Sequence, residues 1–416
     1  MTGVELLAGL AVAVTGAGVI ERLRHRRTLR RIPIRIHVNG TRGKSSVTRL
    51  IAAALREAGR VTCAKTTGTL PRFILPDGRE VPVFRPSRPN VLEQIRIVRA
   101  AAAQEAEVLV IECMAVQPEL QWLSEARFIE ATHGVITNAR PDHLDQMGPG
   151  EDDVAWALCG MVPRRGQLFT AERKRLAFLR AAAADRSSEL IAVGEAECAA
   201  LTELEMGEFS YTEHRDNVAL ALAVVEALGV PRDVALRGMW RVRPDAGALT
   251  FHVLDFFGRR IHFVNGFAAN DPESTEQIWR MALARHPEAT CRVAVFNCRA
   301  DRADRSAQLG AAFPHWPAAD AVVLIGTGTY LFARAAEEQG YDVSRLIFAE
   351  DQSVAQIFET IVGRVGRHSL VMGLGNIGGP GLELVRFFRN REALGDESIA
   401  SEALPAAATD AAPRGT

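Results

Sequence analysis

A glycine-rich stretch between a strand pattern and a helix pattern constrains this chain more than any other feature. Residues 37–46 read HVNGTRGKSS. Before them, apolar residues alternate from Ile32 to Val38, as in a strand. After them, apolar residues recur from Val47 to Leu55 at the three-to-four spacing of an amphipathic helix, which Gly59 ends. This order predicts an α/β fold with an anion-binding loop at the start of the helix.

The stretch has the residues that a phosphate loop needs. Glycines allow successive N–H groups to turn toward phosphate oxygens, a lysine reaches the outer phosphates, and a serine holds magnesium. The strict motif wants a glycine where Val38 stands, so only the shorter form Gly-Thr-Xaa-Gly-Lys-Ser remains, and a serine-capped glycine turn is the alternative. The predicted nucleotide-binding residues are Gly40, Thr41, Arg42, Gly43, Lys44, Ser45 and Ser46. Lysine is rare elsewhere: of the 49 lysines and arginines, only Lys44, Lys65 and Lys174 are lysines.

Size and composition leave room for two domains with appendages. The chain has 416 residues, of which 48% are hydrophobic. The net charge of −1 gives no reason to expect a nucleic-acid partner. The six cysteines show no paired spacing of a zinc site, so we expect reduced thiols.

An apolar run near the N-terminus predicts a membrane anchor. Residues 6–20 are apolar apart from one threonine, and six arginines follow between Arg22 and Arg31. The run is close to the minimum length for a bilayer, and the arginines should stay in the cytoplasm. A signal peptide is disfavoured because the positive charges follow the run. A helix that packs on a partner or lies on the membrane surface is the alternative.

Two further strand patterns end in polar residues. Val108–Cys113 and His133–Asn138 are short and rich in β-branched residues, as buried parallel strands are. Ligands bind beyond the carboxyl ends of such strands, which places Glu112, Asn138 and the Asp-His-Leu-Asp run at 142–145 beside the loop. A helix is predicted from Asn217 to Leu228.

A second α/β region is predicted from Arg241. Apolar strand patterns recur around residues 251–256, 261–264, 293–296, 322–325 and 370–374. The predicted organisation is therefore an anchor with a basic linker (1–31), an ATP-binding domain (32–240), a Rossmann-like domain (241–390) and a disordered tail (391–416).

The order of these motifs resembles the Mur ligase superfamily, and most closely the ligase subunit of bacterial poly-γ-glutamate synthases, from the anchor to Phe388. The loop, Glu112 and the run NARPDHLD at 138–145 carry the resemblance to the superfamily. Further segments carry the closer one: RPSRPN at 85–90, IECMAV at 111–116, NGFAANDP at 265–272, NCRADR at 297–302 and GNIGGPG at 375–381. The resemblance implies a Mur-ligase-like central domain with a parallel sheet, then a Rossmann-like domain, behind a transmembrane helix.

The resemblance also implies a reaction. ATP phosphorylates a carboxylate, and an amino acid's amine displaces the phosphate to form an amide. Lys44 and Mg²⁺ would offset the negative charge, Glu112 would ligate one magnesium with Ser45, and His143 a second one. The alternatives are a helix-capping carboxylate for Glu112 and a buried, hydrogen-bonded histidine for His143.

Other roles carry over from the superfamily. Asn217 would contact adenine, and Arg241 or Arg243 would reach the phosphates from the hinge, against the alternative of a solvated charge. Many Mur-type ligases have a carbamylated lysine about 15 residues beyond the histidine, but Leu158 stands there, so another group must bridge the metals.

Basic residues before Glu112 suit an acidic substrate. Lys65, Arg85 and Arg88 are predicted to bind the growing chain, against the alternative of a solvated face, and Asn138 is predicted as a further substrate contact. Gly373, Gly375 and Gly378 spell GxGxxG, but no acidic residue follows at the distance that dinucleotide binding requires. Close helix–strand packing is therefore the favoured interpretation.

Together these features predict a membrane-anchored ligase that uses ATP and Mg²⁺ to polymerise glutamate for a capsule at the cytoplasmic face of the cell membrane. The predicted partners are glutamate, its polymer, small membrane subunits of an export complex and further copies of an oligomer. One rival is the same chemistry on a folate tail or a cell-wall precursor. A second rival is an ATP-driven motor that exports a polymer made elsewhere.

Overall fold

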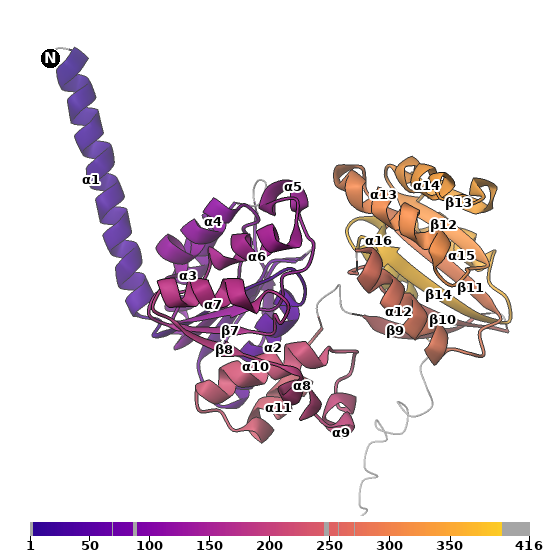
Figure 1. The fold of residues 1–416 in the computed structure, drawn as a ribbon, viewed down its shortest axis with the longest axis horizontal. Coiled ribbons are helices and arrows are strands. Elements are labelled where there is room, and N and C mark those ends of the chain that lie inside the picture. Colours follow the sequence, from indigo (N-terminus) through magenta and orange to yellow (C-terminus); the bar gives the residue numbers. More distant parts are fainter. Residues whose placement is uncertain are drawn as a thin grey trace, which may run out of the picture. The chain divides into compact units, whose positions relative to one another are not determined.

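The computed structural model describes residues 3–68, 70–85, 90–244, 249–256, 258–269 and 271–392 (Figure 1). Arg88 and the predicted tail beyond residue 392 lie outside the described residues. The chain forms two compact units, unit 1 (Met1–Leu249) and unit 2 (Thr250–Thr416). Sequence patterns had placed the start of the second region at Arg241.

The N-terminal helix extends away from the rest of unit 1 (Figure 1). It is α1 (Gly3–Arg30), with a mean hydropathy of 1.9 over its most apolar 18 residues, none of which is buried. Only its last third packs against the body of unit 1, through His25 and Leu29. By length and composition α1 could cross a membrane or serve as a signal sequence.

Unit 1 is built on an eight-stranded sheet in the order β4-β3-β2-β5-β1-β6-β7-β8. All its strand pairs are parallel except β2 with β3 and β3 with β4. The strands are β1 (Ile34–Asn39), β2 (Thr62–Thr66), β3 (Arg72–Ile74), β4 (Glu80–Pro82), β5 (Val108–Glu112), β6 (His133–Ile136), β7 (Gln167–Thr170) and β8 (Glu189–Ala192). β1 lies between β5 and β6, so the carboxyl ends of these three strands meet at one edge.

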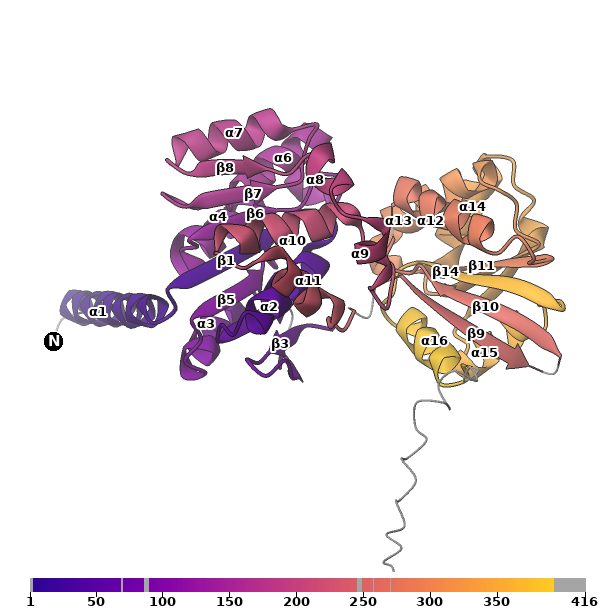
Figure 2. The ribbon, with the colours of Figure 1, turned by 90° about the horizontal axis from the view of Figure 1, so that it is seen from below.

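Helices cover both faces of this sheet (Figure 2). α2 (Lys44–Glu57), α10 (Arg215–Ala227) and α11 (Arg232–Trp240) bury one face, and Val108 and Val110 of β5 point into their core. Leu109 and Ile111 point to the other face. The remaining helices are α3 (Glu93–Ala103), α4 (Pro118–Leu123), η1 (Ser124–Ile129), α5 (Leu144–Met147), α6 (Glu151–Cys159), α7 (Leu176–Asp185), α8 (Glu195–Ala199) and α9 (Glu203–Gly207).

Unit 2 has a six-stranded sheet in the order β13-β12-β11-β14-β10-β9, parallel except for β9. The strands are β9 (Thr250–Phe256), β10 (Arg259–Asn265), β11 (Cys291–Cys298), β12 (Ala321–Gly326), β13 (Leu346–Glu350) and β14 (His368–Gly375). The helices are α12 (Pro272–Arg285), η2 (Ala300–Arg302), α13 (Ala303–Ala312), η3 (Phe313–His315), α14 (Thr329–Glu338), η4 (Val343–Arg345), α15 (Val354–Val362) and α16 (Pro380–Arg389). α15 and α16 bury one face, and Phe296 packs with Phe313 and Phe332 on the other.

The predicted α/β class and most buried strands are confirmed, and the helix predicted from Asn217 to Leu228 is α10. Sequence patterns missed β13 and, in unit 1, β2, β3, β4, β7 and β8. For β8 the reason is that each of its residues is exposed or only half-buried. A strand without a buried face has no alternation to detect.

Candidate active site

The phosphate loop joins β1 to α2 at the edge where three parallel strands end. Val38 pairs with Glu112, and Asn39 with Ile136, so the loop emerges between the ends of β5 and β6. Gly40 and Gly43 have φ angles of 127° and 79°, which other residues rarely adopt. A Cβ atom on Gly40 would also collide with Thr137, so sequence and packing both require glycine.

The first turn of α2 is available to an anion. The N-cap residue is Gly43, no described side chain caps the helix, and the first turn contains no acidic residue. The first N–H groups of a helix have no partner within the helix, and the helix dipole favours a negative charge there. The Lys44 ammonium lies back over the loop, where it donates to the carbonyl oxygens of Gly40 (2.6 Å) and Thr41 (3.3 Å). An incoming phosphate would replace these carbonyls.

Ser45 and Glu112, which are predicted to ligate the same magnesium beside the phosphate loop, are in contact. The Ser45 hydroxyl donates to Glu112 Oε2 over 2.8 Å, and the backbone N–H of Thr67 donates to the same oxygen over 2.7 Å. Glu112 is 2% exposed. A serine hydroxyl and a carboxylate are oxygen donors of the kind that Mg²⁺ prefers. The two residues therefore fit a divalent cation beside the phosphates.

Asn138 braces the loop. Its Oδ1 accepts hydrogen bonds from the Thr41 hydroxyl (2.7 Å) and from the Arg42 backbone N–H (3.1 Å). Its Nδ2 donates to the Arg42 carbonyl over 3.2 Å. These bonds hold the loop in shape, so Asn138 acts on the phosphate loop in this structure, and its predicted contact with substrate stays a prediction.

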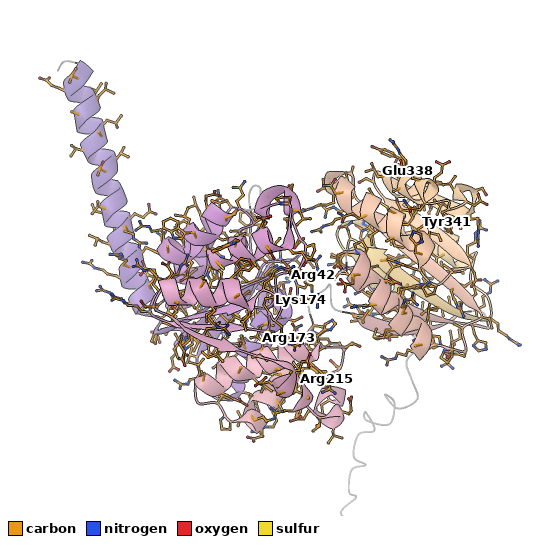
Figure 3. The ribbon with its side chains drawn as sticks, viewed as in Figure 1. Arg42, Arg173, Lys174, Arg215, Glu338 and Tyr341 are labelled. Carbon is orange, nitrogen blue, oxygen red and sulfur yellow. The ribbon has the colours of Figure 1, made fainter. Side chains whose placement is uncertain are left out.

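His143 lies close to the same loop. It adopts a left-handed backbone with φ of 48° at the start of α5. Its Nε2 is 3.9 Å from one oxygen of Asp142, whose other oxygen pairs with Arg42 over 3.1 Å. Figure 3 shows Arg42, Arg173 and Lys174 along the same edge of unit 1. The predicted catalytic residues thus share one end of the sheet, on segments far apart in sequence.

Lys65 and Arg85 form a buried ion-pair network with Glu93, a residue that sequence reasoning missed. The Lys65 ammonium is 2.9 Å from Glu93 Oε1, and Arg85 Nε is 2.6 Å from Glu93 Oε2. Burial lowers the pKa of Lys65, against the opposing effect of Glu93. Lys65 is fully buried, so it lies on neither an open groove nor a solvated face. Glu93 is the first residue of α3. An acidic residue in the first turn of a helix that follows a basic segment was the sequence signal that could have predicted this ion pair.

Asn217 is buried behind the loop. Its Nδ2 donates to Glu213 Oε1 over 2.8 Å, and a Cβ atom on Gly43 would lie 2.5 Å from its Oδ1. Arg241 is at the other end of α2, where it pairs with Glu57 over 2.6 Å, about 20 Å from the loop by helix length. The carbonyl of Arg243 accepts from Arg49, within α2. The structure thus brings Asn217 to the loop and leaves Arg241 away from it.

Leu158, the residue that the superfamily resemblance aligns with a carbamylated lysine, is fully buried among apolar side chains. The buried carboxylate of Glu172 accepts hydrogen bonds from the backbone N–H groups of Ala139 (2.7 Å) and Arg175 (2.9 Å). Glu172 therefore holds the segment after β6 in place.

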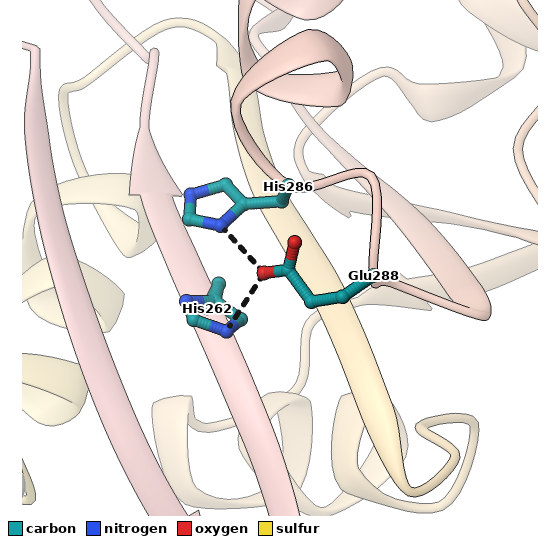
Figure 4. Close-up of side chains that lie close together, drawn as sticks. All are labelled: His262, His286 and Glu288. Atoms are coloured by element: carbon teal, nitrogen blue, oxygen red, sulfur yellow. Dashed lines mark hydrogen bonds and ion pairs between the residues drawn. The ribbon is translucent and has the colours of Figure 1, made fainter.

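A separate cluster in unit 2 brings two imidazoles to one carboxylate (Figure 4). Glu288 Oε1 lies 3.4 Å from His262 Nε2 and 3.2 Å from His286 Nδ1. His262 Nδ1 and His286 Nε2, the other ring nitrogens, are buried and have no partner among the described residues. If a metal bound the two nitrogens that face Glu288, the proton of each imidazole would sit on the other ring nitrogen, which has no described acceptor. Metal-bound histidines normally donate that proton to a hydrogen-bond acceptor. Contacts with Glu288, of which the His286 contact is a hydrogen bond, are the better account of the cluster.

Comparisons with known proteins first establish the class of protein to which the fold belongs. Residues 38–238 match the model of the Mur ligase middle domain. Solved folylpolyglutamate synthases share the fold: the Mycobacterium tuberculosis enzyme complexed with ADP (TM-score 0.63, 19% identity, 88% of this chain and 92% of that one), and the bifunctional Yersinia pestis enzyme complexed with AMPPNP and Mn (TM-score 0.65, 16% identity, 89% and 92%). The fold is therefore that of the Mur-type ligases.

The family follows from closer relatives. Residues 250–391 match the poly-gamma-glutamate synthase CapB C-terminal domain. The capsule biosynthesis protein CapB of Bacillus anthracis is 37% identical over 370 residues, which are 88% of this chain and 79% of that protein. The PGA synthase CapB of Bacillus subtilis (strain 168) is 36% identical, over 88% and 93%. The chain belongs to the CapB family, as its sequence motifs predicted.

Proposed function

We propose that this chain is an ATP-dependent ligase that joins glutamates into poly-γ-glutamate. The single observation that carries the proposal is the contact between Ser45 and Glu112 beside Lys44, at an uncapped helix N-terminus. In a CapB-family chain, this arrangement provides a site for the phosphates of ATP and a divalent cation. The folylpolyglutamate synthases bound to ADP, or to AMPPNP and Mn, support the same cofactors, and we assign Mg²⁺ as the metal.

The residues present suit phosphoryl transfer followed by amide formation. The N–H groups of the first α2 turn and the Lys44 ammonium bind the outer phosphates and offset their charge. A substrate carboxylate oxygen then attacks the γ-phosphorus, and ADP leaves. The amine of glutamate attacks the resulting acyl phosphate, loses a proton, and expels phosphate. Bound at Ser45 and Glu112, the cation would polarise the phosphate oxygens.

His143 is proposed to serve a second cation shared with the acyl phosphate. Its link through Asp142 to Arg42 ties it to the loop that binds the nucleotide. Asn217, behind Gly43, is proposed to meet the adenine side of the nucleotide. Arg241 or Arg243 is proposed to reach the phosphates when the C-terminal domain closes, a movement in which Arg241 would leave Glu57.

The cellular setting is part of the proposal. α1 spans the membrane once, and the arginines that follow its apolar part keep both units in the cytoplasm. An anchored polymerase would hand its product to small membrane subunits, and the enzyme works as an oligomer with them. The folate rival rests on a shared fold at 16–19% identity, whereas the CapB relatives reach 37%.

The test is ADP release by membranes that contain this chain and its partner subunits, with ATP and Mg²⁺, across a panel of amino acids that includes both glutamate enantiomers. We expect glutamate-dependent ADP release together with a growing polyanion. Lys44→Ala should abolish both, while the exposed control Arg180→Ala, on α7, retains them. ADP release that ignores every amino acid would favour the export motor, and release that requires a folate would favour the folate ligase.

A further inference from the structure

A cavity of about 750 Å³ opens where α1 meets the body of unit 1. Its wall comes from three segments: α1 between Gly18 and His25, α3 with the turn before it, and the end of α4 with η1. Gly18 belongs to the apolar part of α1, whereas His25 is buried against the body. The cavity therefore runs from the apolar helix to the polar surface of unit 1.

The C-terminal end of α1 is held in place, so the cavity has a defined wall. Arg22 pairs with Glu130 over 2.6 Å, and His25 Nε2 lies 2.8 Å from the Phe128 carbonyl oxygen. Leu29 packs into the core beside α3. These contacts couple the direction of the helix to the arginines around the cavity.

The cavity carries an excess of positive charge. Among the described residues, five arginines and two glutamates line it. Glu93 is already paired with Lys65 and Arg85, and Glu21 lies 3.4 Å from Arg99. Arg96 and Arg99 are exposed and three residues apart on α3, so they project from the same face of that helix. An anion fits between α1 and α3.

Apolar side chains accompany these arginines. Leu92, at the cavity, is 53% exposed, and Trp122, on the adjoining α4, is 45% exposed. Arg127 lies over the Trp122 ring, 5.9 Å from its centre. Tryptophan and arginine beside apolar residues are typical of the boundary between lipid tails and headgroups. A soluble polyanion would satisfy the arginines but leave this apolar surface in water.

The position of the cavity along α1 agrees with the boundary between lipid tails and headgroups. The helix from Leu6 to Ile20 is exposed and, apart from Thr15, apolar, and it measures about 22 Å. With the residues that flank it, this run approaches the roughly 30 Å of a hydrocarbon core. If α1 spans the bilayer, as proposed above, Glu21 to His25 lie at the headgroups of the cytoplasmic leaflet.

We propose that this cavity binds a glycerophospholipid with a net negative headgroup, its phosphate between Arg96 and Arg99 and an acyl chain along α1 past Gly18. The bound lipid fixes the face that unit 1 turns toward the membrane. The inference rests on the proposed membrane anchor, and the experiment separates the two.

The experiment places the full-length chain in phosphatidylcholine nanodiscs with a trace of photoreactive phosphatidylglycerol or photoreactive phosphatidylcholine. Crosslinked peptides are mapped by mass spectrometry. We expect phosphatidylglycerol to label α3 and η1, and phosphatidylcholine to label them much less. Arg96→Gln/Arg99→Gln should reduce this labelling about tenfold. The matched control Arg164→Gln/Arg180→Gln removes two exposed arginines of unit 1 outside the cavity and should leave labelling unchanged.

Retention of each variant in alkali-washed phosphatidylcholine membranes tests the anchor separately. A chain that is retained but labelled equally by both lipids, or equally after Arg96→Gln/Arg99→Gln, would overturn the lipid site and keep the anchor. Loss of labelling on adding inorganic phosphate would assign the cavity to free anions, and loss on adding soluble poly-γ-glutamate would assign it to the polymer. A chain that is not retained would overturn anchor and lipid site together.

Discussion

Two glycine-rich turns in this chain follow a buried parallel strand and precede a helix, yet their surroundings differ. In unit 1 the turn after β1 leaves the first turn of α2 without a cap or an acidic residue, with Lys44 at its start. In unit 2 the turn after β14 leads to α16, which among the described residues also has no side-chain cap, but whose first turn contains Pro380 and Glu383. Asn297 donates to the carbonyls of Asn376 and Gly378 and occupies the inside of that turn.

The strand-end glutamates differ in the same way. In unit 1, Glu112 accepts from the Ser45 hydroxyl and from the Thr67 backbone, and caps no helix. In unit 2, Glu350 accepts from the backbone N–H groups of Gly328 (2.8 Å) and Thr329 (3.2 Å), at the start of α14. In this comparison, a strand, glycines and a carboxylate indicate a ligand site where no side chain fills the turn and no carboxylate lies at the start of the helix.

The largest effect is expected from Glu112→Gln. The loss of one negative oxygen ligand should weaken the cation site and lower glutamate-dependent ADP release about a thousandfold, with a higher Mg²⁺ requirement. The matched change Glu350→Gln should lower the melting temperature and leave the Mg²⁺ requirement unchanged. Steady-state ADP assays across Mg²⁺ concentrations measure both. Equal losses in the two variants would remove the distinction between the two carboxylates.

Gly43→Ala should lower ADP release about a hundredfold, because the new Cβ at φ of 79° would lie 2.5 Å from Asn217 Oδ1 and displace the loop. Gly59→Ala is the control for backbone strain alone. Gly59 has a similar φ of 80°, but no atom lies within 4 Å of a Cβ placed there. Titration with a fluorescent ATP analogue would show weaker binding only for Gly43→Ala. Similar affinities in both variants would mean that strain, not the loop's neighbours, sets the requirement for glycine.

A buried charge under the loop predicts a pH dependence for unit 1. His37, on β1, lies 2.7 Å from Glu125. Burial lowers the pKa of His37, but hydrogen bonds with Cys113 and Glu125 outweigh it and raise the pKa to about 9. A raised pKa means that the stabilisation is complete below the unfolded value of about 6.5 and disappears as the pH rises through about 9.

The measurement is the free energy of unfolding by urea at a series of pH values. We expect a loss on the order of 3 kcal/mol between pH 6.5 and 9.5. Glu125→Gln keeps a hydrogen-bond acceptor but removes the charge, so its stability should change less over the same range. A slope that is the same in both proteins would assign the pH dependence to other groups.

The sequence predicted the loop, the strand-end Glu112 and their meeting, because parallel strands on either side of β1 must end at one edge of the sheet. It could not predict that Lys65 is buried. That depends on Glu93, 28 positions along the chain, and no local pattern links the two. Nor could it distinguish the two possible roles of Asn138. An asparagine amide suits direct contact with a ligand and equally suits hydrogen bonds that stabilise the ligand-binding loop.

The smallest effect is expected from Gly378→Ala, the change that tests unit 2 directly. A Cβ there would lie 2.8 Å from Arg299 Nη1, the flexible end of a side chain that can move. The free energy of unfolding should fall by less than about 1 kcal/mol, with no change in the KM for ATP. Gly373→Ala, whose Cβ would meet the Phe267 ring, should cost about 1–3 kcal/mol and again spare the KM. A tenfold rise in the KM for ATP in Gly378→Ala, with stability unchanged, would mean that this turn also meets the nucleotide, because packing alone gives it no means to alter ATP binding.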